Sequence, residues 1–517
     1  MRGRILIPWV LAALGAAVYL VVAPPSADLA AQEYRADLGL VIWNNGWYAG
    51  HHTPGYSVLF PPLGGALGVR VTGALASVAA AGLFAALARR HWGDTRGATA
   101  AAAWFAAGTT AVLLSGRITF LLGVAIGAGA LLALSHERRL PALALAALTT
   151  LASPVAGLFA ALAATAWALA APAPLRQRRR VDGAAVVVAA LGPIAILLVL
   201  FPQGGSEPFV ASAFWPALAG TLLVAALLPA HERTLRIGAL LYALALVAAF
   251  AIATPLGGNA TRLGALAAGP VVLGALTGRR SPVLLAALAL AFAYWPLYPA
   301  VRDVARASGD PSLRAAYHAP LVRFLRSRPR AGGFRVEIPF TESHWEARHV
   351  AGGRDGIPLA RGWERQLDRR FGALFYDGSL DAAGYRAWLD ERAVAYVAVP
   401  DVALDAAGRD EARLVDGGLP YLRPVWRNAH WRVFAVTRPT PLASGAGAAA
   451  RLSATGVTLR AARAGDVLVR VHHTRWWRVT AGRACVRAGR GGMTLVRVLA
   501  PGTVRLQARI AGSSCRR

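Results

Sequence analysis

The first 300 residues consist largely of apolar stretches that contain few charged side chains. A helix needs about 20 predominantly apolar residues to cross the hydrocarbon core of a bilayer. Eleven stretches meet or approach this length, and they lie at residues 5–23, 66–88, 98–115, 117–135, 140–152, 154–171, 183–201, 210–229, 235–254, 264–277 and 282–299. The whole chain is 56% hydrophobic and 16% charged, whereas soluble domains carry about 25% charged residues. We therefore expect an α-helical polytopic membrane protein, with a transmembrane bundle at residues 1–299.

Two of the apolar stretches are short and adjoin each other. Residues 140–152 and 154–171 are separated only by the Ser153-Pro154 step. Proline interrupts a helix because it lacks a backbone N–H and its ring clashes with the preceding turn. The pair is therefore expected to form a tight hairpin or a kinked re-entrant pair, and a single long span kinked at Pro154 is the alternative.

The basic residues indicate which ends of the spans face the cytoplasm. The chain has no lysine, so all 55 basic residues are arginine. Arginines cluster in alternate connections between spans, at Arg89-Arg90, Arg138-Arg139, 176–180, 233–236 and Arg279-Arg280. Short cytoplasmic loops carry such an excess. We therefore expect a plasma-membrane protein with a cytoplasmic N-terminus, and the odd number of spans puts the residues after about 300 outside the cytoplasm.

The apolar run at 5–23 also has features of a signal peptide, since it follows two arginines and precedes a Pro-Pro-Ser-Ala segment. Its length of about 19 residues exceeds that of a typical signal-peptide apolar region. We expect an uncleaved anchor.

The residues after position 300 have the charge content of a soluble region, with 36 arginines and 18 acidic residues. Helical and strand spacing alternate at residues 300–442, which predicts a small extracytoplasmic α/β module. A Gly/Ala-rich linker at 443–450 precedes short strands separated by turn residues, so residues 451–517 are expected to form a small β-sandwich. Cys485 and Cys515 both fall in this last module, where a disulfide is chemically allowed.

The net charge of +29 does not by itself indicate nucleic-acid binding. Arginine without lysine, beside abundant alanine and glycine, is typical of a GC-rich codon bias. The excess of arginine after residue 300 suits contact with the anionic headgroups of membrane lipids. We expect no nucleic-acid partner.

The connection between the first two spans, residues 24–65, is far longer than the roughly two to eight residues that join neighbouring helices. It is rich in aromatic and titratable side chains, among them Glu33, Trp43, Trp47, Tyr48, His51 and His52. Long loops of this kind often carry function. The alternative is an interfacial aromatic belt, which accounts for the tryptophans and the tyrosine.

An aromatic belt does not account for Asp28, which stands where the first span meets the outer surface. A carboxylate at that depth is partly removed from bulk water, which suits a general base. The same residue is also placed to cap a helix at residues 29–37, and the two roles are compatible.

This order of features resembles the GT-C class of membrane glycosyltransferases. More narrowly, the chain resembles a group of bacterial GT-C-like membrane proteins, some of which carry the label "6-pyruvoyl-tetrahydropterin synthase-related". The resemblance spans most of the chain and rests on short motifs, namely Asp28, Trp43-Asn44, 47–50, 54–62, Gly116-Arg117, 120–123, Gly258-Asn259, Arg262, 339–341, 344–346, 362–366, Trp388-Leu389 and Tyr396-Val397.

The resemblance implies an inverting transferase that builds cell-envelope glycans and uses a sugar donor carried on a polyprenyl phosphate. Asp28 would be the catalytic base, and Arg262, with Arg117 second, would bind the donor phosphate; for each arginine the alternative is snorkelling to the interface. The aromatic and histidine side chains of the first loop, together with Glu33, would contact the sugar or the glycan or lipid acceptor. Asp28 is followed by Leu29-Ala30, so the paired acid that supports a divalent metal in several GT-C enzymes is absent. The cofactor stays open at this point: a divalent metal is compatible with the class but has no paired-acid motif to support it, and no metal ligand is assigned.

Two other functions are compatible with the sequence. The first is a catalytically inactive GT-C-like scaffold for envelope assembly. The second is a secondary transporter, which is less favoured because eleven spans do not divide into equal halves and no matching pair of interrupted spans is visible.

Overall fold

The computed structural model describes residues 2–328, 333–353 and 356–516. The chain folds into two compact units. The first comprises Met1–Ala36 and Gly55–Ser308, and the second comprises Asp37–Pro54 and Gly309–Arg517. The chain therefore contributes to the second unit twice, once with a short segment near its N-terminus and once with its C-terminal part.

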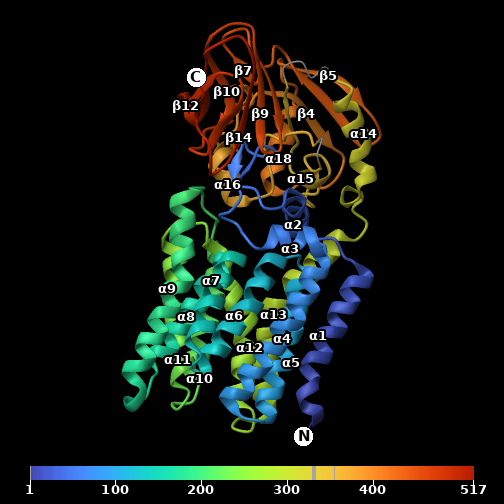
Figure 1. The fold of residues 1–517 in the computed structure, drawn as a ribbon. Helices are drawn as coiled ribbons and strands as arrows, with labels where there is room; N and C mark the ends of the chain where they lie inside the picture. Colours follow the sequence, from blue (N-terminus) through green and yellow to red (C-terminus); the bar gives the residue numbers. More distant parts are fainter. Residues whose placement is uncertain (1, 329–332, 354–355, 517) are drawn as a thin grey trace. The chain divides into compact units, whose positions relative to one another are not determined.

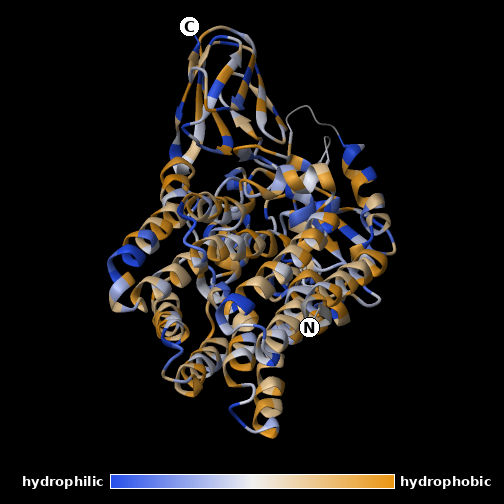
Figure 2. Ribbon diagram, turned by 60° about the horizontal axis from the view of Figure 1, so that its bottom comes forward, coloured by the Kyte–Doolittle hydropathy of each residue, from blue (hydrophilic) through white to orange (hydrophobic). Residues whose placement is uncertain are grey.

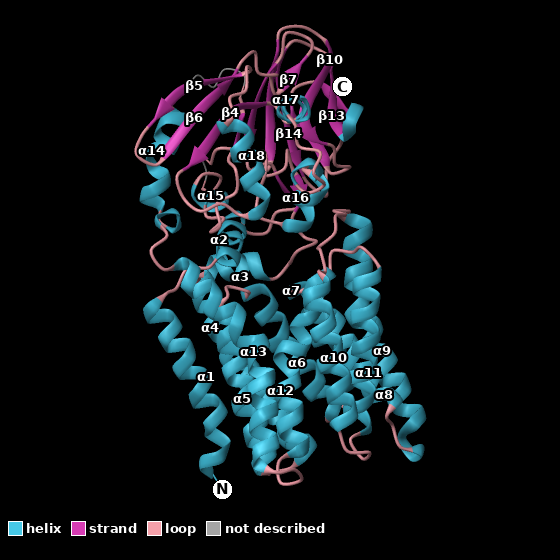
Figure 3. Ribbon diagram, turned by 180° about the vertical axis from the view of Figure 1, so that it is seen from behind, coloured by secondary structure: helices cyan, strands magenta, loops and turns pink. Residues whose placement is uncertain are grey.

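The first unit is a helical bundle in which the long helices run side by side, with the short helices α2 and α3 at one end (Figures 1 and 3). The helices are α1 (Arg2–Val22), α2 (Ala27–Leu38), α3 (Phe60–Leu67), α4 (Val69–Trp92), α5 (Arg96–Leu114), α6 (Ile118–Ser135), α7 (Arg139–Ala152), α8 (Pro154–Leu169), α9 (Arg176–Leu200), α10 (Ala211–Leu227), α11 (Arg233–Ala251), α12 (Arg262–Leu276) and α13 (Pro282–Ala307). Every apolar stretch counted in the sequence coincides with one of these helices. Apolar residues predominate along them in Figure 2.

Six helical segments in the described part of the chain are long and apolar enough to cross a membrane, by length and composition. They are α4, α5, α6, Ala173–Leu200, α11 and α13. A seventh is added if α1 and α2 count as one broken span, with an 82° bend between them. Helices α7, α8 and α10 are apolar but shorter. The predicted class of a multi-pass helical membrane protein is confirmed, whereas the number of eleven spans stays a prediction.

Small residues let the helices of this unit approach closely. A side chain at Gly82 of α4 would meet the indole of Trp9, and one at Gly274 of α12 would meet the indole of Trp92. Close approach of this kind is a main source of helix association in lipid, where the surroundings are as apolar as the helix surface. Large apolar side chains such as Val188 and Leu244 are correspondingly exposed on the outside of the bundle.

Helices α7 and α8 are separate and pack against each other. The break is the single residue Ser153, whose backbone is extended and whose hydroxyl accepts a hydrogen bond from the Ala156 N–H of α8. The first loop provides hydrogen bonds to the C-terminal end of α7. The backbone N–H groups of Val58 and Leu59 both donate to the Leu151 carbonyl, at 2.8 and 3.0 Å. The hairpin expected from the Ser-Pro step is thus the observed arrangement.

The second unit begins with the α/β region expected from the sequence. A four-stranded sheet has the order β3-β4-β6-β5, with β3 (Arg335–Glu337) parallel to β4 (Val394–Pro400) and the pair β5 (Leu422–Arg427) and β6 (Trp431–Val436) forming an antiparallel hairpin. The accompanying helices are α14 (Ala315–Arg326), α15 (Glu346–His349), α16 (Arg365–Phe371), α17 (Ala382–Glu391) and α18 (Ala406–Asp416). Tyr385, Trp388 and Leu389 of α17 pack into the core on one face of this sheet.

The β-sandwich follows in the chain and consists of a five-stranded and a four-stranded sheet. One sheet has the order β15-β12-β13-β10-β7 and the other has the order β11-β14-β9-β8. The strands are β7 (Ala443–Ser444), β8 (Ala449–Ser453), β9 (Gly456–Ala461), β10 (Gly465–His472), β11 (Trp477–Ala481), β12 (Ala484–Ala488), β13 (Met493–Val498), β14 (Gly502–Ala508) and β15 (Cys515–Arg516). The segment 443–450 contributes β7 and the start of β8. Cys485 and Cys515 lie opposite each other in β12 and β15 and form a disulfide.

The early segment 37–54 forms the strands β1 (Trp43–Asn44) and β2 (His51–His52), which pair with each other. It joins both parts of the second unit. The Gly46 carbonyl accepts from the Leu359 N–H at 2.9 Å in the α/β region, and the Ala49 carbonyl accepts from the His472 N–H at 2.8 Å in the sandwich. Gly50 has φ +102°, and a side chain there would collide with the Trp43 indole. Glycine is therefore the residue that this turn requires.

Candidate active site

Asp28 and Arg117 form an ion pair in the first unit. The Arg117 Nε lies 3.3 Å from the Asp28 Oδ2, and both side chains are partly accessible, at 26% and 36% exposed. Asp28 belongs to the first turn of α2, where a carboxylate is favoured by the helix dipole. Arg117 follows the tight turn between α5 and α6. The helix begins at Ala27, so the alternative of Asp28 as the N-terminal cap is not the observed arrangement.

Glycine at position 116 permits this approach. Gly116 has φ +72°, and a side chain there would lie 2.9 Å from the Leu29 backbone nitrogen and would also collide with the Ser26 hydroxyl. The turn before α6 can therefore press against the start of α2 only without a side chain. Gly116 thus allows the close approach of the turn to α2, and Arg117 forms the ion pair with Asp28 there.

Arg262 comes from a distant part of the chain to the same place. It begins α12, after the 3₁₀ segment Gly257–Thr261. Its guanidinium lies over the Phe120 ring, 5.4 Å from the ring centroid, and it is in electrostatic range of Arg117 and Asp28. Within the residues that the structure describes, its side chain has neither a hydrogen bond nor an ion pair. The carboxylates in electrostatic range of Arg262 are those of Asp28 and Glu207.

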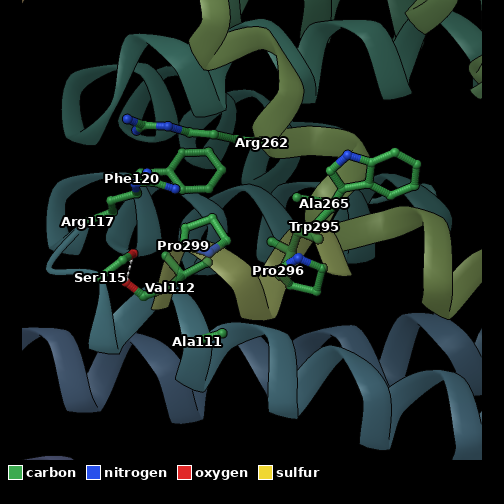
Figure 4. Close-up of a pocket in the computed structure, with 11 residues that line it drawn as sticks. Ala111, Val112, Ser115, Arg117, Phe120, Arg262, Ala265, Trp295, Pro296 and Pro299 are labelled. Carbon is green, nitrogen blue, oxygen red and sulfur yellow. Dashed lines mark hydrogen bonds between the residues drawn. The ribbon is translucent and has the colours of Figure 1, made fainter. Parts of the chain in front are cut away.

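The two arginines line a pocket in the bundle (Figure 4). Its empty volume is about 350 Å³ and includes space open to solvent. In Figure 4 both guanidinium groups lie beside the Phe120 ring, and Trp295, Pro296 and Pro299 of α13 form another part of the lining. The remaining lining residues are Ala111, Val112, Ser115, Ala265 and Leu266. The pocket is therefore mainly apolar, with a cationic group at two positions, which suits an amphiphilic anion.

A set of buried hydrogen bonds fixes α2 beside α6. Gln32 lies one turn after Asp28 on the same face of α2, and its amide nitrogen donates to the Tyr56 hydroxyl at 2.8 Å. The Thr119 hydroxyl donates to the Gln32 carbonyl oxygen. The Arg35 guanidinium stacks on the Tyr56 ring, 3.6 Å from its centroid. These contacts hold the helix that carries Asp28 in a defined position.

A second carboxylate, Asp303 of α13, lies in electrostatic range of Asp28 and Arg117 and accepts a hydrogen bond from Arg302. The sequence did not point to it, because it is 275 positions from Asp28 and has no acidic neighbour. Gln32 and Tyr56 were also missed, although the helical spacing of Asp28 and Gln32 was a usable signal. No group of three or more His, Cys, Asp or Glu side chains that could hold a metal ion is found among the residues described.

The aromatic and histidine residues expected to contact the sugar or acceptor belong to the second unit. All five are buried, and Trp47 and Tyr48 are fully so. Trp43 packs in the sandwich core against Trp477, and the Trp47 indole donates to the Ala347 carbonyl.

Tyr48, His51 and His52 also have polar contacts with other residues of the second unit. The Tyr48 hydroxyl accepts from the Glu364 N–H at 2.9 Å, His51 faces the Glu364 carboxylate at 3.7 Å, and His52 bonds to the Thr474 hydroxyl at 2.9 Å. The role of these residues in sugar contact stays a prediction, and their observed role is to form the interior of the second unit.

Glu33, the remaining residue assigned to acceptor contact, lies on α2 in the first unit and is half-buried. It is in electrostatic range of Tyr19 of α1. The structure therefore brings together Asp28, Arg117 and Arg262 and assigns Glu33 to a neighbouring part of the same unit.

No protein-family model matches this chain, and no curated protein sequence matches it. Solved structures with a similar fold exist. ArnT from Cupriavidus metallidurans, bound to undecaprenyl phosphate, is 13% identical, with a TM-score of 0.46 over 82% of this chain and 97% of that chain. The oligosaccharyltransferase of Archaeoglobus fulgidus, in the apo form, is 13% identical, with a TM-score of 0.48 over 77% of this chain and 69% of that chain.

Proposed function

We propose that this protein is a membrane glycosyltransferase that takes its sugar from a polyprenyl-phosphate-linked donor. The observation that carries the proposal is an apolar pocket of the helical bundle that Arg117 and Arg262 line, with Asp28 paired to Arg117. A lipid phosphate needs fixed cations beside apolar surface, and arginine is the cation best suited to a phosphate because it binds two oxygens at once. The pocket supplies both features.

In the proposed reaction, Asp28 accepts the proton of the acceptor hydroxyl as its oxygen attacks the anomeric carbon. The bond from that carbon to the phosphate oxygen breaks, and its electron pair leaves with polyprenyl phosphate. Attack from the face opposite the leaving group inverts the anomeric centre. Arg117 and Arg262 stabilise the charge that develops on the leaving phosphate. The proton on Asp28 is then released to water.

The ion pair between Asp28 and Arg117 suggests that donor binding precedes proton transfer to Asp28. In the structure, the Arg117 guanidinium faces the Asp28 carboxylate. A phosphate in the pocket competes for the same guanidinium, because a doubly hydrogen-bonded phosphate is a stronger partner than a single, partly exposed contact. Donor binding would thus draw Arg117 away and leave the carboxylate free to accept a proton. The base is available when the donor is in place.

The orientation of the chain is part of the proposal. The arginine clusters lie at the ends of α4, α7, α9 and α11 and between α12 and α13, whereas the site residues lie at the opposite helix ends. The cluster-bearing ends are assigned to the cytoplasm, which puts the pocket and the second unit on the outer side. A function in building cell-envelope glycans follows from that placement.

The test uses the full chain in nanodiscs of neutral lipid. We expect it to bind a polyprenyl phosphate and to transfer sugar from a polyprenyl-phosphate donor to added acceptors, with inversion seen by NMR of the product. Binding without any transfer would favour the inactive scaffold. Absence of binding to the lipid phosphate would contradict the proposal as a whole.

A further inference from the structure

The β-sandwich carries an extreme imbalance of charge. From Arg451 to Arg516 the sequence contains 13 arginines and a single acidic residue, Asp466. A codon bias toward arginine explains why these residues are not lysine, but it does not explain why almost no acid accompanies them. In residues 301–450, by comparison, 22 arginines are accompanied by 17 acids. The imbalance is therefore a property of this module.

The single acid is neutralised on one of the two sheets. Asp466 lies on β10 in the five-stranded sheet and pairs with Arg487 of β12 at 3.0 Å and with Arg497 of β13 at 3.1 Å. The strands of the other sheet, β11-β14-β9-β8, contain no acidic residue. Asp466 thus compensates part of the positive charge of the five-stranded sheet, whereas the four-stranded sheet has no acid of its own.

Strand alternation decides which side chains this sheet presents to solvent. Val457, Leu459, Val504 and Leu506 point into the core. The residues between them therefore lie on the outer face. These outward residues include Arg451 of β8, Arg460 of β9, Arg478 of β11 and Arg505 of β14, with Thr458, Thr480, Thr503 and Gln507 among them. We call this set the basic face.

The register of the strands sets the spacing of the charges. Arg505 lies opposite Thr458, and Thr458 lies opposite Arg451, so these three residues form a row across the sheet. Arg460 lies two residues further along β9, opposite Thr503. Neighbouring strands are about 4.8 Å apart and alternate residues about 7 Å apart. Successive guanidinium groups are therefore anchored roughly 8–10 Å from one another, with hydroxyl groups between them.

The basic face has free cationic groups. Arg451, Arg460 and Arg505 are exposed, and none of them forms an ion pair with another described residue. Arg478 differs, because its guanidinium donates to the carbonyls of Arg475, Trp477 and Ile510. Three arginines are thus available to an external anion, and the fourth is held by its own chain.

We propose that the basic face binds an anionic glycan, that is, a hydroxyl-rich chain bearing carboxylate or phosphate groups. Arginine recognises either group through two parallel hydrogen bonds. The interleaved Thr and Gln side chains are donors and acceptors for sugar hydroxyls. The proposal concerns a surface remote in sequence from the transferase pocket and does not depend on the proposed function.

The side chains of this module favour a glycan over a membrane surface. Proteins that lie on a bilayer combine basic residues with apolar or aromatic side chains that insert between headgroups. Among the described residues of the sandwich, Ile510 is the only large apolar side chain that is exposed. The basic face itself offers arginine, threonine and glutamine. A flexible polar polyanion fits these groups better than a lipid surface does.

The experiment compares three polymers of one length, namely carboxymethyl dextran, dextran phosphate and neutral dextran. The full chain is held in nanodiscs of neutral lipid, and binding is measured by biolayer interferometry at low and at physiological salt. We expect either or both charged dextrans to bind, in a salt-dependent manner, and neutral dextran not to bind. The charged polymer that binds more tightly identifies the preferred acidic group.

Two triple variants remove the same charge from different places. R451Q/R460Q/R505Q removes the three exposed arginines of the basic face. R463Q/R483Q/R490Q changes three exposed arginines in turns of the same module. We expect the first to weaken binding about tenfold or more, since it removes three exposed charge contacts at once. The second should stay within about twofold of the parent.

Three results would overturn the proposal. One is the absence of binding to either charged dextran. Another is equal weakening by the two triple variants, which would mean attraction by net charge alone. The last is capture of vesicles rich in anionic lipid in preference to charged dextran, with loss in R451Q/R460Q/R505Q, which would make the face a membrane contact.

Discussion

The Arg117 guanidinium, on the turn before α6, lies 3.3 Å from the carboxylate of Asp28, on the first turn of α2. These residues are 89 positions apart in the chain. Their contact connects the helix that follows the first span with the pocket that Arg117 and Arg262 line. In the proposed function, it is the contact between the base and the donor's phosphate site.

Replacing Asp28 by asparagine tests the base. Asp28→Asn keeps the size of the side chain but cannot accept the acceptor's proton, so we expect transfer to fall by about 10²–10⁴-fold. Binding of a polyprenyl phosphate should be retained or tightened, because Arg117 loses its competing partner. Rates of transfer and the affinity for the lipid phosphate measure the two effects.

The control for this substitution is Asp94→Asn, at an exposed position in the turn before α5. It should transfer sugar at the parental rate. Full activity of Asp28→Asn would show that another group removes the proton, and Asp303→Asn would be the next variant to measure.

Replacing Arg262 tests the anion site. Arg262→Ala removes a guanidinium that has no hydrogen bond or ion pair in the described part of the chain, so the fold should tolerate the change. We expect the affinity for polyprenyl phosphate to fall about tenfold or more, and Arg262→Lys to restore only part of it, because lysine lacks the planar fork. Microscale thermophoresis in nanodiscs measures the dissociation constants.

Arg96→Gln, an exposed arginine at the start of α5, controls for the loss of one positive charge. Equal affinities for the parent and Arg262→Ala would place the lipid phosphate elsewhere.

Trp47 distinguishes a core residue from a sugar-stacking residue. The side chain is fully buried, stacks on His51 at 6.0 Å between ring centroids, and fills the space beside Gly362. We expect Trp47→Ala to destabilise the second unit by about 3–5 kcal/mol through the cavity that it leaves. Hydrogen exchange of peptides in the second unit measures the change. A variant of parental stability with a raised KM for the acceptor would instead support contact with sugar.

Stability of the second unit should also depend on pH through Glu346. Burial raises the pKa of this carboxyl from 4.5 to about 7, and hydrogen bonds from Thr341 oppose the rise only in part. The His344 ring nitrogen Nδ1 lies 3.9 Å from its carboxylate, and Asp405 is in electrostatic range. The folded chain therefore holds a proton that the unfolded chain releases. The contribution of Glu346 to the free energy of unfolding is fully present below about pH 4.5 and is lost as the pH rises through 7.

We expect Glu346→Gln to remove this part of the pH dependence, which amounts to at most roughly 3 kcal/mol. The exposed residue Glu391 supplies the control substitution Glu391→Gln. Chemical denaturation of the second unit between about pH 5 and pH 8 makes the comparison. Parallel curves for the parent and Glu346→Gln would refute the assignment.

Much of this architecture can be predicted from the sequence because its signals are local. Each apolar stretch in the first unit is continuous along the chain, and α17 follows from the helical spacing of Tyr385, Trp388 and Leu389. The approach of Arg117 to Asp28 is also traceable, since both were expected at span ends that face the same side. The number of membrane crossings is less determined, because helices such as α7 and α10 are shorter than a bilayer is thick.

The environment of the first loop could not be predicted in the same way. A tryptophan that lies at a membrane interface, stacks on a sugar or fills a core presents the same local pattern. What decides among these roles is the partner, and the partners of Trp43 and Trp47 are Trp477 and Ala347, which are hundreds of positions away. The same holds for Asp303, whose neighbour Asp28 is 275 positions away in the chain.

The insertion of segment 37–54 into the second unit fixes the order in which the protein can mature. This segment leaves the ribosome among the first residues, yet its hydrogen-bonding partners, from Leu359 to His472, are made last. Trp43, Trp47 and Tyr48 are buried in the final structure. Until the C-terminal part of the chain is made, these side chains lack their final neighbours while the apolar helices are inserted. The second unit is therefore completed only after the bundle, and a fragment that begins at Gly309 would lack two of its strands. The second unit therefore reaches its final structure only after the whole of the first unit has been synthesised.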